Sequence, residues 1–222
     1  MKKLLITSLA LFTSACLFGE TWTFDDLTGW SGDTSKSSIV TAPAGMTGNA
    51  LLMEGTNADQ MSWMEWDTTL GSYTTPTVSF QFWMEDTDPA NPSELFIRTN
   101  GWDDFVSIKE DDEATDAFVM EVRGGGSAFD PIAIGGIAFE TVHEVELVYQ
   151  PGNEIDIKLD GVLVDTSTGQ AWDADASFGA LSIRSQKATS YVDNLEIVPE
   201  PAAYAALFGL LALGFVAYRR RR

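Results

Sequence analysis

Acidic and apolar residues alternate between positions 154 and 160, in the segment Glu-Ile-Asp-Ile-Lys-Leu-Asp. Alternate residues of an extended strand face the same side, so Glu154, Asp156, Lys158 and Asp160 are predicted to share one face. Two carboxyl groups about 5–5.5 Å apart can act as nucleophile and general acid on a glycosidic bond. However, Lys158 stands between the acids and Asp160 precedes a glycine. We therefore favour the polar outer face of a hairpin and keep catalysis as the alternative.

Tryptophan is the second residue type with binding chemistry, and the chain has seven. Trp102, in Asn-Gly-Trp-Asp-Asp, and Trp172, in Gln-Ala-Trp-Asp, lie in turn-like segments beside polar residues. Exposed loop aromatics of this kind suit contact with the apolar face of a sugar. Trp63 and Trp66 lie in the largely apolar segment 61–66, where core packing is expected. Trp102 and Trp172 are the predicted ligand-binding candidates.

A single histidine and a single cysteine restrict the remaining chemistry. His143 has no nucleophile motif near it in the sequence and is interpreted as an ordinary strand residue. Cys16 alone allows no intramolecular disulfide and no thiolate zinc cluster. We predict no catalytic residue.

The charge of the chain is concentrated in its middle. Residues 20–198 carry 32 acidic and 7 basic residues, a net charge of −25 within a total of −20. Nucleic acids are therefore not expected as partners, because phosphate binding needs clustered Lys and Arg. The same segment is dense in Trp, Phe, Ile and Val, unlike disordered acidic chains. At this length it is predicted to be one folded domain.

The N-terminus has the pattern of a secretory signal peptide over residues 1–19. Lys2 and Lys3 precede an apolar run, 4–12, that is too short to span a bilayer. Cleavage after Ala15 and cleavage after Gly19 both fit. Residues 13–16 also match part of a lipoprotein cleavage box, with lipidation of Cys16 as the less favoured alternative.

The C-terminus ends in an apolar segment followed by arginines. Residues 202–218 contain no charged side chain, and Arg219, Arg220, Arg221 and Arg222 follow directly. A helix of that length covers about 26 Å, enough for a thin bilayer. Arginines beside such a helix stay on the cytoplasmic side. The body before the helix is therefore predicted to lie outside the cytoplasm.

Pro199-Glu200-Pro201, the apolar segment and the arginine cluster stand in one order within residues 199–222. This tripartite pattern resembles the sorting signal of PEP-CTERM proteins. The resemblance implies processing by an exosortase in a Gram-negative bacterium that makes exopolysaccharide. It also implies an inner-membrane precursor that becomes a cell-surface or matrix protein. A permanent membrane anchor is the alternative.

Residues 20–198 are predicted to be β-structure almost throughout. Segments rich in β-branched and aromatic residues alternate with Gly, Pro, Asn and Asp, and no convincing helix precedes the C-terminal segment. Ten or more short strands in one domain predict a sandwich or jelly roll. The expected strands cover 22–24, 50–53, 61–66, 77–84, 94–98, 118–123, 142–150, 154–159, 179–184 and 190–198.

Three segments refine this fold prediction. The opening Thr23–Trp30, the hairpin Ile157–Val164 with its Leu-Asp-Gly turn, and the closing Tyr191–Ile197 resemble concanavalin A-like (laminin G-like) jelly rolls. The same family includes carbohydrate-binding modules and hydrolases. The predicted fold is therefore an all-β, concanavalin A-like jelly-roll β-sandwich between a signal peptide and one C-terminal transmembrane helix.

This second resemblance also implies a metal site and an alternative activity. In related binding modules, acids on the paired first and last strands hold structural calcium, which places Asp25 or Asp26 with Asp193 as candidate ligands. Residues 154–160 resemble the E-x-D-x-x-E strand of the laminarinase-like hydrolases, with Asp160 as an imperfect match. The predicted protein is exported, non-catalytic and in contact with exopolysaccharide. A polysaccharide hydrolase or lyase and a ligand-free surface protein are the alternatives.

Overall fold

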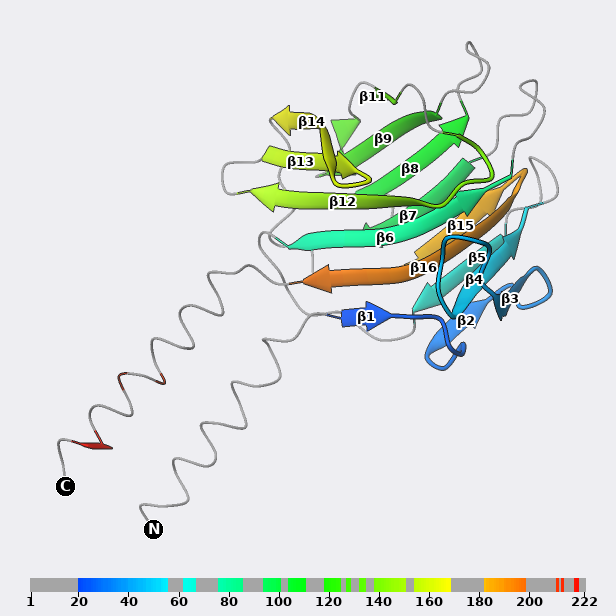
Figure 1. The fold of residues 1–222 in the computed structure, drawn as a ribbon, viewed down its shortest axis with the longest axis horizontal. Coiled ribbons are helices and arrows are strands. Elements are labelled where there is room, and N and C mark those ends of the chain that lie inside the picture. The colour runs from blue at the N-terminus through cyan, green and yellow to red at the C-terminus, as the bar shows by residue number, and fades with distance from the viewer. Residues whose placement is uncertain are drawn as a thin grey trace.

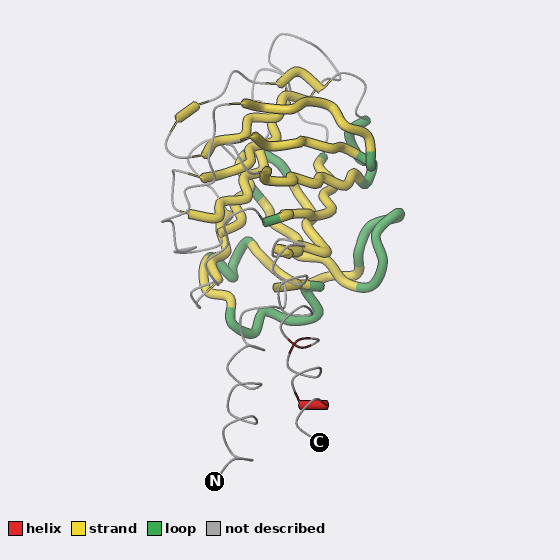
Figure 2. Tube along the Cα trace, turned by 90° about the vertical axis from the view of Figure 1, so that its left-hand side faces the viewer, coloured by secondary structure: helices red, strands yellow, loops and turns green. Residues whose placement is uncertain are grey.

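The computed structural model describes eleven stretches of the body and four positions near the C-terminus. The stretches are residues 20–55, 62–66, 76–85, 94–100, 104–110, 118–124, 127–128, 132–134, 138–150, 154–168 and 182–198, and the four positions are 211, 213, 218 and 219. The body within these ranges consists of β-strands joined by turns (Figures 1 and 2).

The strands form two stacked sheets (Figure 1). Within each sheet, every pair of neighbouring strands is antiparallel. Sheet A has the order β14 (Val162–Thr168), β13 (Glu154–Leu159), β12 (His143–Gln150), β6 (Thr77–Met84), β16 (Thr189–Val198), β4 (Asn49–Glu54) and β3 (Ser37–Thr41), and β1 (Glu20–Trp22) also pairs with β16. Sheet B has the order β10 (Ser127–Ala128), β9 (Phe118–Gly124), β8 (Asp104–Glu110), β7 (Glu94–Asn100), β15 (Ser182–Gln186), β5 (Ser62–Trp66) and β2 (Trp30–Gly32), and β11 (Ile132–Ile134) also pairs with β9. The predicted all-β jelly-roll sandwich is confirmed for the described residues.

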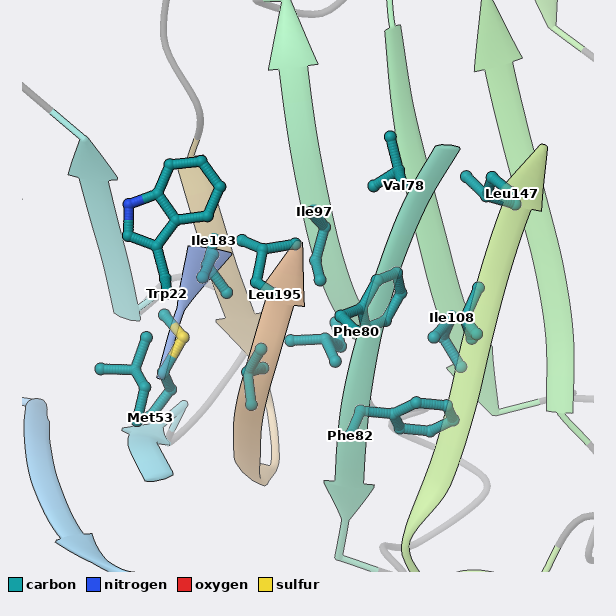
Figure 3. Packing of buried hydrophobic residues seen from close by; sticks show 14 of the residues in the cluster. Trp22, Met53, Val78, Phe80, Phe82, Ile97, Ile108, Leu147, Ile183 and Leu195 are labelled. Atoms are coloured by element: carbon teal, nitrogen blue, oxygen red, sulfur yellow. The ribbon is translucent and has the colours of Figure 1, made fainter. Parts of the chain in front are cut away.

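Alternation along the central strands decides which side chains form the core. On β6, Val78, Phe80, Phe82 and Met84 are buried, whereas the residues between them are half-buried on the outer face. Phe80 and Phe82 extend from sheet A toward the strands of sheet B, as Figure 3 shows. Each such side chain contributes about 1.5–3 kcal/mol on burial, so the continuous core is the main stabilising feature.

A cluster of aromatic rings closes the sandwich where β1 meets β2 and β5. Trp22, Trp30 and Trp66 contact one another edge to face, with ring centroids 5.4–6.3 Å apart. Gly29 lies against this cluster with φ of +84°, and a Cβ there would come within 2.7 Å of the Trp66 ring. Only glycine satisfies both constraints at this turn.

The last strand, β16, pairs with two different strands along one of its edges. Residues 195–197 pair with β1, and residues 189–192 pair with β4. The register with β6 slips between Asp193 and Glu196, and Asn194 there has φ of +50°. This β-bulge directs polar side chains onto the outer face of sheet A. The predicted pairing of the first and last strands is confirmed.

Candidate functional site

Asp193 is a carboxylic acid enclosed by protein at the bulge of β16. The residue is 1% exposed, and its Oδ1 atom has no hydrogen-bond partner. Burial, with a smaller contribution from the negative charge of Asp25, raises the pKa of Asp193 to about 6. Such an acid costs free energy when ionised unless a cation or a donor compensates it.

Asp25 and Asp26, the two acids predicted as alternative partners of Asp193, have different surroundings in the structure. Phe24 has φ of +49°, so the predicted strand 22–24 ends at Trp22, and the chain turns to bring Asp25 under the electrostatic influence of Asp193. Asp26 instead accepts the backbone N–H of Thr28 at 2.7 Å, which lowers the pKa of Asp26. Asp26 is thus the acceptor of a local turn.

A calcium ion fits this site in part. The buried Oδ1 atom of Asp193 has no partner, and Asp193 also experiences the negative charge of Asp25, so a hard cation would stabilise this carboxylate. Calcium takes six to eight oxygen ligands. Within the described residues no group of three acidic, histidine or cysteine side chains converges on one point.

The alternating acids of β13 lie on the outer face of sheet A, as the alternation predicted. Lys158 donates to Glu146 on β12, which raises the pKa of Lys158. Asp156 accepts hydrogen bonds from Thr166 at 2.8 Å and from Gln150 at 3.3 Å. Asp160 is an exception, because it lies beyond the strand in the Asp-Gly turn with φ of +49°.

His143 and Asp160 form a clamp that the sequence interpretation of His143 missed. The Nδ1 atom of His143 lies 2.8 Å from Asp160 Oδ2, and its Nε2 atom lies 3.0 Å from the carbonyl oxygen of Ala138. Asp160 Oδ1 also accepts the backbone N–H of Glu144 at 2.9 Å. The clamp ties the β13–β14 turn and the turn at residues 138–141 to the start of β12.

Replacing His143 with alanine is expected to lower the free energy of unfolding by about 1–3 kcal/mol, because the side chain is buried and both of its nitrogens are bonded. Urea unfolding followed by tryptophan fluorescence measures the change. Glu154→Ala, at an exposed position on β13, is the control and should shift stability by less than about 0.5 kcal/mol. Equal, small effects of the two substitutions would show that the clamp is not stabilising.

The outer face of sheet B combines aromatic rings with enclosed polar groups. Trp63, Arg184, Phe96 and Ser107 are successive cross-strand partners on β5, β15, β7 and β8. Trp63 is 38% exposed, so the prediction of core packing is wrong for it and correct for Trp66. Successive side chains of a strand point to opposite faces. Since Ser62 and Met64 on either side of Trp63 are buried, the Trp63 side chain points to the outer face.

Buried hydroxyl groups distinguish this face from an ordinary solvated one. Ser107 and Ser182 are 0% and 4% exposed although their strand neighbours, Ile108 and Ile183, point into the core. Ser107 donates to Glu94 Oε1 at 2.5 Å. Both hydroxyls are enclosed by protein, so the groups of this row that reach the surface are the exposed Trp63 ring and the half-buried Arg184 and Phe96 side chains.

The outer face of sheet B also carries charged side chains, the cation Arg184 and the acid Glu65. Desolvation lowers the pKa of Arg184, and the negative charge of Glu65 acts in the opposite direction. Glu65 lies on β5, two residues along from Trp63. The described part of the face thus presents both donors and acceptors to a ligand.

Several predicted site residues lie outside the described residues: Trp102, Trp172, Pro199, Glu200, Pro201, Arg220, Arg221 and Arg222. Arg219, with Leu211, Leu213 and Tyr218, is described as helical. Over the positions that the structure describes, no helix is both long and apolar enough to cross a membrane.

No protein-family model matches the chain. No curated protein sequence matches it either.

Solved structures share the fold at low sequence identity. A carbohydrate esterase from the Shiga toxin-encoding bacteriophage phi24B superposes with a TM-score of 0.60 and 12% identity, over 81% of this chain and 97% of the other. The Bacillus licheniformis β-glucanase gives 0.57 and 14%, over 82% and 98%. The metal-free carbohydrate recognition domain of Emp46p gives 0.55 and 10%, over 80% and 91%. At these identities, the similarity identifies the architecture: this chain has the jelly-roll β-sandwich of those proteins.

Proposed function

We propose that this chain is an exported surface or matrix protein whose non-catalytic sandwich binds exopolysaccharide through the outer face of sheet B. The observation that carries the proposal is the row of Trp63, Arg184 and Phe96 across three strands, in which the Trp63 ring is exposed and the other two side chains are half-buried. Aromatic rings stack on the apolar faces of sugars, and fixed polar groups orient their hydroxyls. The likeness to carbohydrate-active and carbohydrate-recognising folds supports this choice of ligand.

Two acids of this face, Glu65 and Glu94, are too far apart to act together in retaining hydrolysis. Glu65 pairs with Ser182, and Glu94 pairs with Gln186 four residues along β15. At about 3.3 Å per residue and 4.8 Å per strand, their Cα atoms lie about 16 Å apart. Retaining glycosidases need carboxyl groups about 5–5.5 Å apart. These two described acids therefore do not form such a pair.

Binding and cleavage are tested together by incubating the protein with a panel of polysaccharides, with and without Ca²⁺. The expected result is co-sedimentation with at least one polysaccharide and no new reducing ends. Release of reducing ends that disappears in Glu154→Gln would favour a hydrolase. Calcium-dependent melting without any polysaccharide binding would favour a ligand-free structural protein.

Calcium is proposed as a structural ion rather than as part of the ligand site. Its ligands would include Asp193 and Asp25, where the buried Oδ1 atom of Asp193 lacks a donor. When bound, the ion would neutralise this carboxylate and fasten the segment after β1 to β16. The apo protein should retain the fold, because the aromatic and aliphatic core does not depend on this site.

Export and sorting complete the proposal, and they rest on the sequence of the two termini. Replacing Pro199, Glu200 and Pro201 with alanine in a host with an exosortase should leave full-length precursor in the inner membrane. Immunoblots of membrane and released fractions measure this. The tail would be a permanent anchor if the native chain and the triple variant fractionated identically as membrane-bound precursor.

A further inference from the structure

The outer face of sheet A carries a groove of about 290 Å³ that none of the sites described above uses. It crosses β12, β6, β16 and β1, at the bulge where β16 changes neighbours. The size suits a single sugar ring or a ligand of similar volume. The polar side chains that line it are Thr21, Ser79, Gln81, Glu144, Asn194 and Glu196.

Hydrogen bonds orient part of this lining. Asn194 Nδ2 donates to Gln81 Oε1 at 3.0 Å, and Thr21 lies near Glu196, with Oγ1 to Oε1 at 3.5 Å. Each of these side chains keeps further hydrogen-bonding capacity, because an amide offers two N–H groups and a carboxylate accepts several donors. Planar amide and carboxylate groups of this kind can bind neighbouring hydroxyls of a sugar.

An aromatic pair lies on the same outer face, beyond the residues that line the groove. Trp83 is two residues along β6 from Gln81, and its cross-strand partner is Tyr191 on β16. Both rings are half-buried on the outer face, and their centroids are 5.1 Å apart at 84°. Because both rings are partly accessible at the surface, they offer aromatic area that a bound sugar could contact.

Charge restricts the ligand class. The lining contains two carboxylates, Glu144 and Glu196, and no basic side chain. The negative charge of these side chains would repel a ligand carboxylate or phosphate in the groove. Uronic acids and phosphates are therefore excluded, and a neutral ring fits.

We propose that this groove is a second saccharide site, specific for a neutral pyranose unit. The inference rests on the proposed polysaccharide binding and extends it. The two sheets are stacked on each other (Figure 1) and pack by their inner faces. The groove, on the outer face of sheet A, and Trp63, on the outer face of sheet B, therefore lie on opposite sides of the sandwich. One protein molecule can then hold two polysaccharide strands and cross-link them.

The test uses the full chain in micelles of an uncharged detergent without a sugar head group. Titrations with neutral hexasaccharides of β-1,3-glucan, β-1,4-glucan, xylan and mannan should find one that binds at two sites per chain. Trp83→Ala and Gln81→Met should each weaken one site at least tenfold, and Trp63→Ala should weaken the other. Glu54→Gln, at an exposed position on β4 of the same sheet and outside the groove lining, is the matched control and should leave both sites unchanged. Circular dichroism checks that every variant is folded.

The outcomes separate this inference from the proposed function. Binding at one site only, lost in Trp63→Ala and unchanged in both groove variants, would overturn the second site and leave the proposed function intact. Tighter binding of hexagalacturonate than of neutral sugars, lost in the groove variants, would overturn the assigned ligand class. Absence of saccharide binding in every case would overturn both proposals.

Discussion

In EDTA at pH 8, Asp193→Asn is expected to raise the free energy of unfolding by up to about 3 kcal/mol. The Asp193 carboxyl group has a pKa of about 6 in the folded protein against an ordinary value of 3.8. Each pKa unit corresponds to about 1.4 kcal/mol, so the ionised group opposes folding by about this amount. Asparagine has nearly the same shape and carries no charge, which removes the cost of ionisation, whereas the desolvation of its buried amide N–H groups keeps the net gain below this limit.

The pH dependence has a defined sign. Because the folded protein binds this proton more tightly than the unfolded chain, the favourable contribution of Asp193 is complete below about pH 4 and is lost as the pH rises through 6. The stability difference between variant and native protein should therefore grow over that window. Urea unfolding in EDTA at several pH values measures it. A variant less stable than the native protein at pH 8 would contradict this account of Asp193.

The effect of Ca²⁺ on the melting temperature is a second, independent test of Asp193. At pH 8, Ca²⁺ should raise the melting temperature of the native protein, and Asp193→Asn should lose most of that rise. Asp26→Asn is the control, because Asp26 is exposed and accepts a hydrogen bond that asparagine can also accept. It should keep the calcium response. An equal response of all three proteins, or none in the native protein, would overturn the calcium proposal.

Trp63→Ala is expected to weaken polysaccharide binding by at least tenfold at the outer face of sheet B. Trp63 is 38% exposed and lies directly opposite Arg184. Loss of the ring removes apolar contact area worth about 1.4 kcal/mol or more, which corresponds to a factor of ten. Affinity electrophoresis in gels that contain the bound polysaccharide measures the change.

Two control variants make this result specific. Trp63→Phe keeps an aromatic ring and should retain most of the affinity. Glu54→Gln, at an exposed position on β4 of sheet A, should leave the affinity unchanged. Stability should change little in Trp63→Ala because the ring lies outside the core. Unaltered binding of Trp63→Ala would show that this face is not the binding surface.

The sequence predicted the fold where alternation was strong. On β6 and β12 buried residues alternate without interruption with half-buried or exposed ones, and both strands were predicted to within one residue. Strands such as β3, Ser-Ser-Ile-Val-Thr, were missed because polar residues occupy most positions and tertiary contacts decide their conformation. The end of β1 also depended on tertiary structure, since Phe24 adopts a positive φ that its residue type does not favour.

The sites were less predictable because they depend on which strands become neighbours. Asp193 was identified through the pairing of the first and last strands, but its burial follows from the bulge in β16. His143 and Asp160 are 17 residues apart, and only the β12–β13 hairpin brings them together. Likewise, the rows that include Trp63 and Trp83 require strands from distant parts of the chain.

The central claim is that the sandwich binds polysaccharide without cleaving it. Calorimetric titration of the full chain with exopolysaccharide purified from its own host, together with a reducing-end assay of the same mixture, tests it most directly. We predict saturable binding with no increase in reducing ends. No heat of binding, with and without Ca²⁺, or a steady release of reducing ends would contradict the account.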